Sequence, residues 1–235
     1  MATLTQIVTA IRGILDDPDY TEAIVVDQIN DALLIIAAGI EIPNRGISAP
    51  LPDLFTTGSV STSLTLPYVS LPADYQRSVV SIYDSSSNII NPPKGGDYYA
   101  FSQFLKQISS LSLTETGSVY TLCIKGSKLY YQGIPSVSEV LGLHYYKTPT
   151  VLALDGDVPS CLPTHLQLGL LKHYVCKEIM GEKIEDGQDN VGIGAKYHTT
   201  KFFEYLISLT NFIGIDSSPQ YYGSSEFEDR GACDV

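Results

Sequence analysis

The sequence has no tryptophan, and only 17% of its 235 residues are charged, against roughly a quarter in a typical soluble domain. Basic residues are the scarcest charged group: 14 lysines and arginines stand against 26 acids, and they form no cluster. Proteins that grip DNA place Lys and Arg against its phosphates. The composition therefore excludes tight DNA binding. The net charge of −12 is still compatible with a protein that lies next to DNA without binding it.

Long apolar runs are also missing. No segment approaches the ~20 consecutive apolar residues that span a bilayer, and residues 1–17 lack the basic segment and continuous apolar core of a signal peptide. We therefore expect no membrane contact. No C-x-x-C pair occurs among the four cysteines, which predicts reduced thiols in a chain without a secretion signal; they are Cys123, Cys161, Cys176 and Cys233.

No motif of catalysis is complete. His173 and Cys176 are three residues apart, and His165 precedes them, but no carboxylate lies at ligand spacing, so burial is the favoured interpretation over a metal or thiol site. The glycines of residues 191–195 follow no strand and indicate a helix start. Residues 155–157 (DGD) resemble part of a calcium loop without its later ligands. We predict no enzyme activity, cofactor or metal.

Tyrosine, in contrast, is abundant, with 16 residues, and the apolar fraction of 44% is ample for a core. A tyrosine has an apolar ring and a polar tip, so it suits surfaces that are wet before assembly and buried afterwards. The alternative is that these are ordinary strand residues, since tyrosine favours strands.

Helical periodicity begins at the N-terminus. It predicts a helix over residues 3–15, with Thr3 as N-cap and an apolar stripe of Leu4, Ile7, Val8, Ile11 and Leu15. Pro18 breaks it, and Thr21 is predicted to cap a second helix over residues 22–40. The second apolar face should contain Ile24, Val25, Ile29, Leu33, Ile36 and Ile40. The opposite side should carry Asp27, Asn30 and Asp31.

The middle of the chain has β character. After a loop over residues 41–53, hydroxyl and apolar residues alternate from Ser59 to residue 68, and residues 71–84 (LPADYQRSVVSIYD) turn into a strand. Asp74 is predicted to close that turn. Further predictions are a turn at 85–88, a short strand at 89–90, a helix over 97–108, a hairpin over 118–133 and a strand over 138–149.

The helical period returns after Pro163. Thr164 is predicted to cap a helix to about residue 180, whose wide stripe indicates a central position; it consists of Leu166, Leu168, Leu170, Leu171, Tyr174, Val175 and Ile179. A last helix over residues 191–213 should bury Phe202, Phe203, Leu206, Leu209 and Phe212. The remaining residues have no period and predict a flexible tail.

These elements predict an α+β fold in which a helical bundle is formed by the N- and C-terminal helices. An antiparallel β-rich subdomain is inserted between them, and an extended C-terminal tail follows. The predicted segments are a helix pair and loop (1–58), the β-rich subdomain (59–150), the C-terminal helix pair (151–213) and the tail (214–235).

Two stretches resemble one protein family. Residues 4–33 (LTQIVTAIRGILDDPDYTEAIVVDQINDAL) form a helix pair with a "DD…Y" break and an "INDAL" second helix, and residues 71–84 carry the proline turn and strand. Together they resemble the head-to-tail adaptor (head completion) proteins of tailed bacteriophages. The layout of the C-terminal helices and tail is also similar to that family.

The resemblance implies a structural subunit in the virion, at the head–tail junction, assembled in the host cytoplasm. It implies a homo-oligomeric ring, typically of twelve copies, beneath the portal protein, with tail or nozzle proteins docking below. DNA passes through the lumen without specific binding. A different virion structural protein, such as a tail completion or tube-capping subunit, is the alternative, and an enzyme or small-ligand binder is a third possibility.

Two groups of residues are candidate contacts. Tyr221, Tyr222 and Phe227 lie between acids in the tail and are predicted anchors on the portal or a neighbouring subunit. The alternative is a solvated tail with no partner. Lys125 and Lys128 lie at the hairpin tip, where they would contact tail proteins, line the channel, or form a plain solvent-facing turn.

Overall fold

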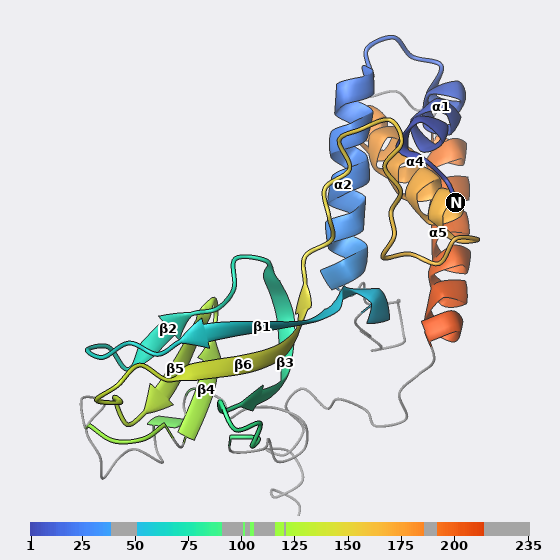
Figure 1. Cartoon of the computed structure of the whole chain (residues 1–235). Coiled ribbons are helices and arrows are strands. Elements are labelled where there is room, and N and C mark those ends of the chain that lie inside the picture. The colour runs from blue at the N-terminus through green and yellow to red at the C-terminus, as the bar shows by residue number, and fades with distance from the viewer. Residues whose placement is uncertain are drawn as a thin grey trace, which may run out of the picture.

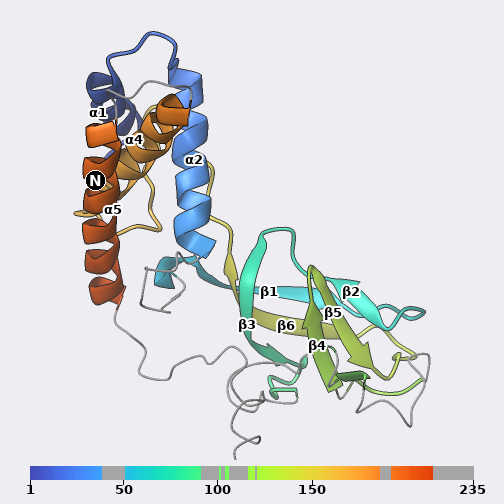
Figure 2. The ribbon, with the colours of Figure 1, turned by 180° about the vertical axis from the view of Figure 1, so that it is seen from behind.

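The chain has the shape of an L, with a helical bundle as one limb and a β arm as the other (Figure 1) (Figure 2). The computed structural model describes residues 1–38, 51–90, 101, 104–105, 116–119, 121–185 and 192–213. The bundle contains α1 (Leu4–Leu15), α2 (Glu22–Ala38), α4 (Gln167–Glu185) and α5 (Gly192–Ile213). The short helix η1 (Pro52–Leu54) leads from the bundle into the β arm.

The N-terminal helix begins where the sequence predicts. Thr3 forms a capping box: its hydroxyl accepts from the backbone N–H of Gln6, whose side chain accepts from the backbone N–H of Thr3. The predicted stripe is buried as a whole. Asp16, with φ of 43°, ends the helix, and the hydroxyl of Thr21 caps the next one.

Helices from both ends of the chain share one core, as predicted. Helix α4 lies at the centre and contacts α1, α2 and α5, and its residues Leu170, Leu171 and Val175 have no exposed surface. One ion pair fastens the turn between α1 and α2 to the end of α4. There, Lys183 donates to the carboxylate of Asp17 at 2.6 Å and keeps the pKa of that carboxyl below its ordinary value.

Within the described residues, the β arm contains two three-stranded antiparallel sheets. One has the order β1 (Phe55–Ser61), β6 (Val140–Lys147), β3 (Tyr75–Tyr83). The other has the order β2 (Tyr68–Ser70), β5 (Lys128–Gln132), β4 (Thr121–Lys125). A separate apolar core lies in the arm, and it includes Leu141, Leu143 and Tyr145 of β6. The predicted α+β fold is confirmed, whereas the segment limits stay a prediction.

The proline turn of residues 71–74 has a more specific role than the sequence indicates. The N–H of Tyr75 donates to the carbonyl of Pro72, which closes the turn. The carboxylate of Asp74 instead accepts from the hydroxyl of Tyr145 at 2.7 Å. Burial, together with this carboxylate, raises the pKa of Tyr145 to about 12. The stretch therefore fixes the register of β3 on β6.

Several predicted boundaries are wrong. Helix α4 begins at Gln167 rather than after Thr164, because the carbonyl of Pro163 accepts from two following N–H groups and holds residues 164–166 in a turn. The helix then continues to Glu185, five residues beyond the predicted end. Strand β1 begins at Phe55 rather than Ser59 and ends at Ser61. The predicted β stretch up to residue 68 is therefore interrupted by a loop before β2 begins.

The strand predicted at 89–90 is a single bridge between Tyr83 and Ile89. The hairpin of β4 and β5 is confirmed. Other predictions lie outside the described residues: the end of the second helix at residue 40, most of the helix over 97–108, and the tail over 214–235. Within 97–108, the described residues 101, 104 and 105 are helical.

Three apolar residues that were predicted to be buried are exposed. Conversely, one polar residue that was predicted to lie on the polar side of its helix is bound to another segment of the chain. Ile24 is 42% exposed, Leu168 37% and Phe212 63%, because each lies at the margin of a stripe that the neighbouring helices do not cover. Asn30, predicted on the polar side of α2, binds the backbone of Leu152 in both directions. It thereby holds the segment that returns from the β arm to the bundle against α2.

Candidate interaction surfaces

The two lysines of the predicted hairpin tip lie opposite each other at the ends of β4 and β5. Gly126, with φ of 59°, allows the tight turn between them. The ammonium of Lys125 lies 4.1 Å from the ring centroid of Phe101, and that of Lys128 lies 4.2 Å from the ring of Tyr68. Both cations are therefore held over aromatic faces within the arm. Their contact with tail proteins stays a prediction. The predicted contact of Tyr221, Tyr222 and Phe227 with the portal or a neighbouring subunit also stays a prediction, because these three residues lie outside the described residues.

His173, considered from the sequence together with Cys176 and His165, has a different partner in the structure. His173 on α4 lies with its Nδ1 atom 2.8 Å from Nδ1 of His198 on α5, and both side chains are buried. Burial, reinforced by the charge of Lys172, lowers the pKa of His173 to about 4 and also lowers that of His198. Both rings are neutral at pH 7, with one Nδ1 donating and the other accepting.

Sequence reasoning missed His198, although a signal was present. His198 belongs to the buried stripe of α5, which consists of Ala195, His198, Phe202, Leu206 and Leu209. A polar residue in such a stripe needs a buried partner. Position 173 supplies it from the facing helix.

The thiol next to this pair is not activated. Cys176 is fully buried, and burial raises its pKa to about 11, as it does for Cys123 and Cys161. These thiols stay protonated at neutral pH and behave as small apolar side chains. Among the residues that the structure describes, no three His, Cys, Asp or Glu side chains gather as a metal site would require.

The DGD segment has a structural role at the start of α1. The carboxylate of Asp157 accepts from the backbone N–H groups of Ala153 and Leu154. The carbonyls of Asp155 and Asp157 accept from the first N–H groups of α1. These acids therefore shape a turn that satisfies the exposed end of the helix.

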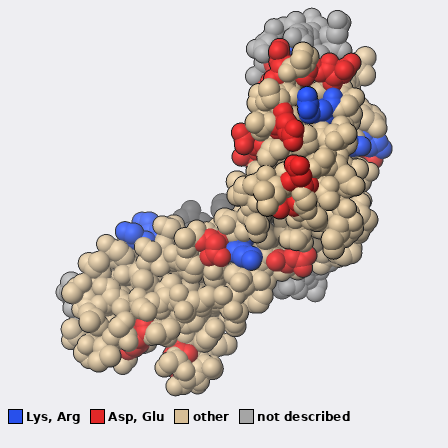
Figure 3. Space-filling model, turned by 45° about the horizontal axis from the view of Figure 1, so that its top comes forward, with Lys and Arg blue, Asp and Glu red and all other residues tan. Residues whose placement is uncertain are grey.

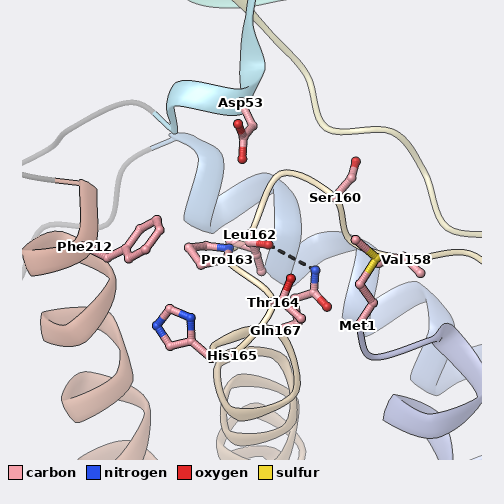
Figure 4. A pocket seen from close by; sticks show the side chains of 10 residues that line it. All are labelled: Met1, Asp53, Val158, Ser160, Leu162, Pro163, Thr164, His165, Gln167 and Phe212. Atoms are coloured by element: carbon pink, nitrogen blue, oxygen red, sulfur yellow. Dashed lines mark hydrogen bonds between the residues drawn. The ribbon is translucent and has the colours of Figure 1, made fainter.

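A cavity of about 420 Å³ opens at the end of the bundle nearest η1 (Figure 4). The amide of Gln167 donates to the carbonyls of Pro159 and Leu162 and accepts from the N–H of Ala2, so its polar atoms are satisfied. His165 packs edge-on against Phe212, with ring centroids 5.4 Å apart. The polar groups here tie segments together and specify no ligand.

The far end of the β arm carries two loops that are fastened to each other. Thr62 after β1 exchanges backbone and hydroxyl hydrogen bonds with Ser138 and Glu139 before β6. The buried hydroxyl of Tyr131 accepts from the N–H of Ser63 at 2.7 Å and donates to the carbonyl of Leu66 at 2.9 Å. We call the two loops, residues 62–67 and 134–139, with Val140 at the start of β6, the distal tip.

Comparison with known families decides what class of protein carries these features. The protein-family model that is described as "SU10 adaptor protein" matches residues 2–223 of the chain. The chain belongs to this family. No curated protein matches the sequence. The SU10 adaptor family is a family of phage adaptor proteins, so the resemblance based on residues 4–33 and 71–84 is confirmed.

Membership in the SU10 adaptor family places the chain in a class of structural virion proteins that is not an enzyme class. An adaptor of this kind assembles with portal and tail proteins. Within the described residues, no helix combines the length and apolar character needed to cross a bilayer.

Proposed function

We propose that this SU10 adaptor is a subunit of the phage head-to-tail connector. Copies of the chain form a ring beneath the portal at the head–tail junction of the virion, twelve of them by analogy with similar adaptors. DNA passes through the lumen, and tail or nozzle proteins attach below. The observation that carries this proposal is the family match, which extends over residues 2–223.

The placement of the basic side chains is compatible with a passage that does not retain DNA. Binding to DNA needs Lys and Arg free to displace counterions from phosphates. Five described lysines are instead engaged within the chain. Lys177, Lys183 and Lys201 pair with carboxylates, and Lys125 and Lys128 lie over aromatic rings.

The test is to determine whether the protein binds portal rings, and where on them it binds. Purified protein is mixed with purified portal rings, and the complex is imaged by electron microscopy and weighed by native mass spectrometry. We expect one ring of the chain capping one end of the portal. A chain that instead caps isolated tail tubes and ignores portal rings would be a tail completion subunit, and the proposal would be wrong.

The tail is proposed to supply the anchor on the portal or a neighbouring subunit. Tyr221, Tyr222 and Phe227 offer aromatic anchors, and the acids around them favour a basic groove. A variant with all three changed to Ser keeps the charge and length of the tail, whereas deletion of residues 217–235 removes both. We expect both variants to bind portal rings at least about tenfold more weakly; binding equal to that of the native chain would overturn this role.

The hairpin tip is proposed to contact tail proteins. The variant K125S/K128S should weaken their attachment to preformed portal–adaptor complexes and leave portal binding intact. Lys172→Ser and Lys196→Ser, on the bundle, serve as charge-matched controls. Unchanged tail attachment would identify the tip as a solvent-facing turn.

A further inference from the structure

The charge of the chain is divided unequally between its two limbs. Residues 51–147, which contain the β arm, hold six acidic and six basic residues, so the whole net charge of −12 belongs to the bundle segments and the tail. Figure 3 shows acidic side chains gathered on the bundle, while the face of the arm in view is mostly uncharged. Two bundles brought together would therefore repel each other, whereas an arm against a bundle would not.

The distal tip presents apolar side chains where a loop is normally polar. The exposed fractions are 54% for Leu64, 45% for Leu66, 73% for Val137 and 51% for Val140. The buried hydroxyl of Tyr131 holds the first loop in place, and the bonds of Thr62 join it to the second. A rigid apolar surface at the end of an arm has the properties of a preorganised docking element.

A second apolar surface lies on the outer side of the bundle. Ile24, Leu34 and Ile35 on α2 are each 42–43% exposed. The segment that Asn30 holds against α2 adds Val151 and Leu154, which are 68% and 71% exposed. We call these five residues the α2 face. Helix α2 itself lies on the side of the bundle from which the β arm projects (Figure 1).

A closed ring needs two different surfaces on each subunit, because every copy meets one neighbour with one surface and the next neighbour with the other. The distal tip and the α2 face belong to different limbs, and both are apolar. The α2 face also carries the exposed acids Asp27 and Asp31, which a neighbouring bundle would repel and a neutral arm would not.

We propose that the distal tip of one copy docks on the α2 face of the next copy around the ring. This inference rests on the proposed function, since it assigns the contact between subunits of that ring. The occupant of each surface is a second copy of the same chain, and the interface is arm to bundle rather than bundle to bundle.

Photo-crosslinking of the full-length chain tests the contact. A photoreactive amino acid replaces Val137, which is the most exposed of the four apolar tip residues, and the protein is assembled with portal rings and irradiated. Mass spectrometry of the crosslinked dimer should locate the attachment within residues 22–38 or 151–154 of another copy. The same amino acid at Ile193, which is 86% exposed on α5, serves as the matched control and should not label the α2 face.

A pair of polar variants gives a second measurement. L64S/V137S changes only exposed side chains, so the thermal unfolding temperature should stay close to that of the native chain. The concentration needed for half-maximal ring assembly should rise about tenfold or more. Ile193→Ser should leave it unchanged.

The outcomes separate this inference from the proposed function. Crosslinks within residues 22–38 or 151–154 of another copy, with weakened assembly of L64S/V137S, support the docking. Rings that form normally but crosslink the tip to portal, to a tail protein, or to another part of the chain overturn it and leave the proposed function intact. A chain that forms no ring with or without portal overturns both.

Discussion

The Nδ1 atoms of His173 and His198 lie 2.8 Å apart between α4 and α5, where a single proton joins two neutral rings. The ring of Tyr205 stacks on His173 with centroids 5.6 Å apart. Lys172 and Lys201 are the nearby cations, and Glu204 the nearby acid. Protonation of both histidines would leave two charges in contact within the bundle core and would break the shared hydrogen bond.

Acid should therefore destabilise the bundle through this pair. The pKa of His173 is lowered from 6.5 to about 4 in the folded chain, and that of His198 is also lowered. Between pH 6.5 and about 4, the unfolded chain binds more protons than the folded chain. The stabilisation by the neutral pair is therefore complete above pH 6.5 and is lost as the pH falls toward 4. We expect the loss in unfolding free energy to be on the order of 1–2 kcal/mol between pH 7 and 5.

Urea unfolding at pH 7 and pH 5 measures this loss. His198→Gln removes one titrating ring, keeps a hydrogen-bonding partner for His173, and should reduce the pH dependence. His165→Gln, at an exposed histidine, should leave it as in the native chain. Equal pH dependence in the native chain and in His198→Gln would show that the pair is not responsible.

Two glycines of α4 should respond to alanine in opposite directions. A Cβ atom at Gly169 would lie 2.3 Å from Cε1 of Tyr205, so the ring that stacks on His173 would have to move. We expect Gly169→Ala to lower the unfolding free energy by about 1–3 kcal/mol. At Gly181 a Cβ atom meets nothing within 4 Å, and alanine should raise the unfolding free energy by about 0.5–1 kcal/mol.

Circular dichroism during urea unfolding reports both changes. Gly181→Ala controls for helix propensity, because it lies on the same helix. A Gly169→Ala variant stabilised as much as Gly181→Ala would mean that Tyr205 swings aside without loss.

The existence and type of the long elements could be predicted from the sequence, because periodicity depends on residues close together in the chain. The N-cap at Thr3 and the apolar stripe of α1 are such local signals. The limits of burial were less predictable. Ile24 and Phe212 continue the periodicity of their helices, but how much of a stripe is covered depends on where the facing helices end.

Pairings between distant segments could not be predicted. Asn30 looks like a surface residue beside Asp27 and Asp31, and only the returning segment, 122 residues later, gives its side chain two backbone partners. The bond between Asp74 and Tyr145 depends in the same way on strand register. Leu64 belongs to the alternating stretch that predicted a strand from Ser59 to residue 68, but it lies in the loop between β1 and β2 and is exposed.

Loss of the Asn30 amide should loosen the junction between bundle and β arm. Its Nδ2 donates to the carbonyl of Leu152 at 3.1 Å, and its Oδ1 accepts from the N–H of Leu152 at 2.9 Å. Asn30→Leu keeps the volume, removes both bonds, and should cost about 1–3 kcal/mol of unfolding free energy. Asp31→Ala, exposed on the same helix, should have little effect, and hydrogen exchange should quicken at Leu152 only in Asn30→Leu.

Removal of a single oxygen should loosen the distal tip without emptying the core of the arm. In Tyr131→Phe the ring still fills its buried site, but the N–H of Ser63 and the carbonyl of Leu66 lose their shared partner. We expect a loss of about 1–3 kcal/mol in unfolding free energy and faster amide exchange over residues 63–66. Tyr130→Phe, on the same strand and half-buried, is the matched control. Ring assembly should weaken in Tyr131→Phe, because a mobile tip must be ordered before it can dock; native assembly together with fast exchange over residues 63–66 would show that the rigidity of the tip is not needed.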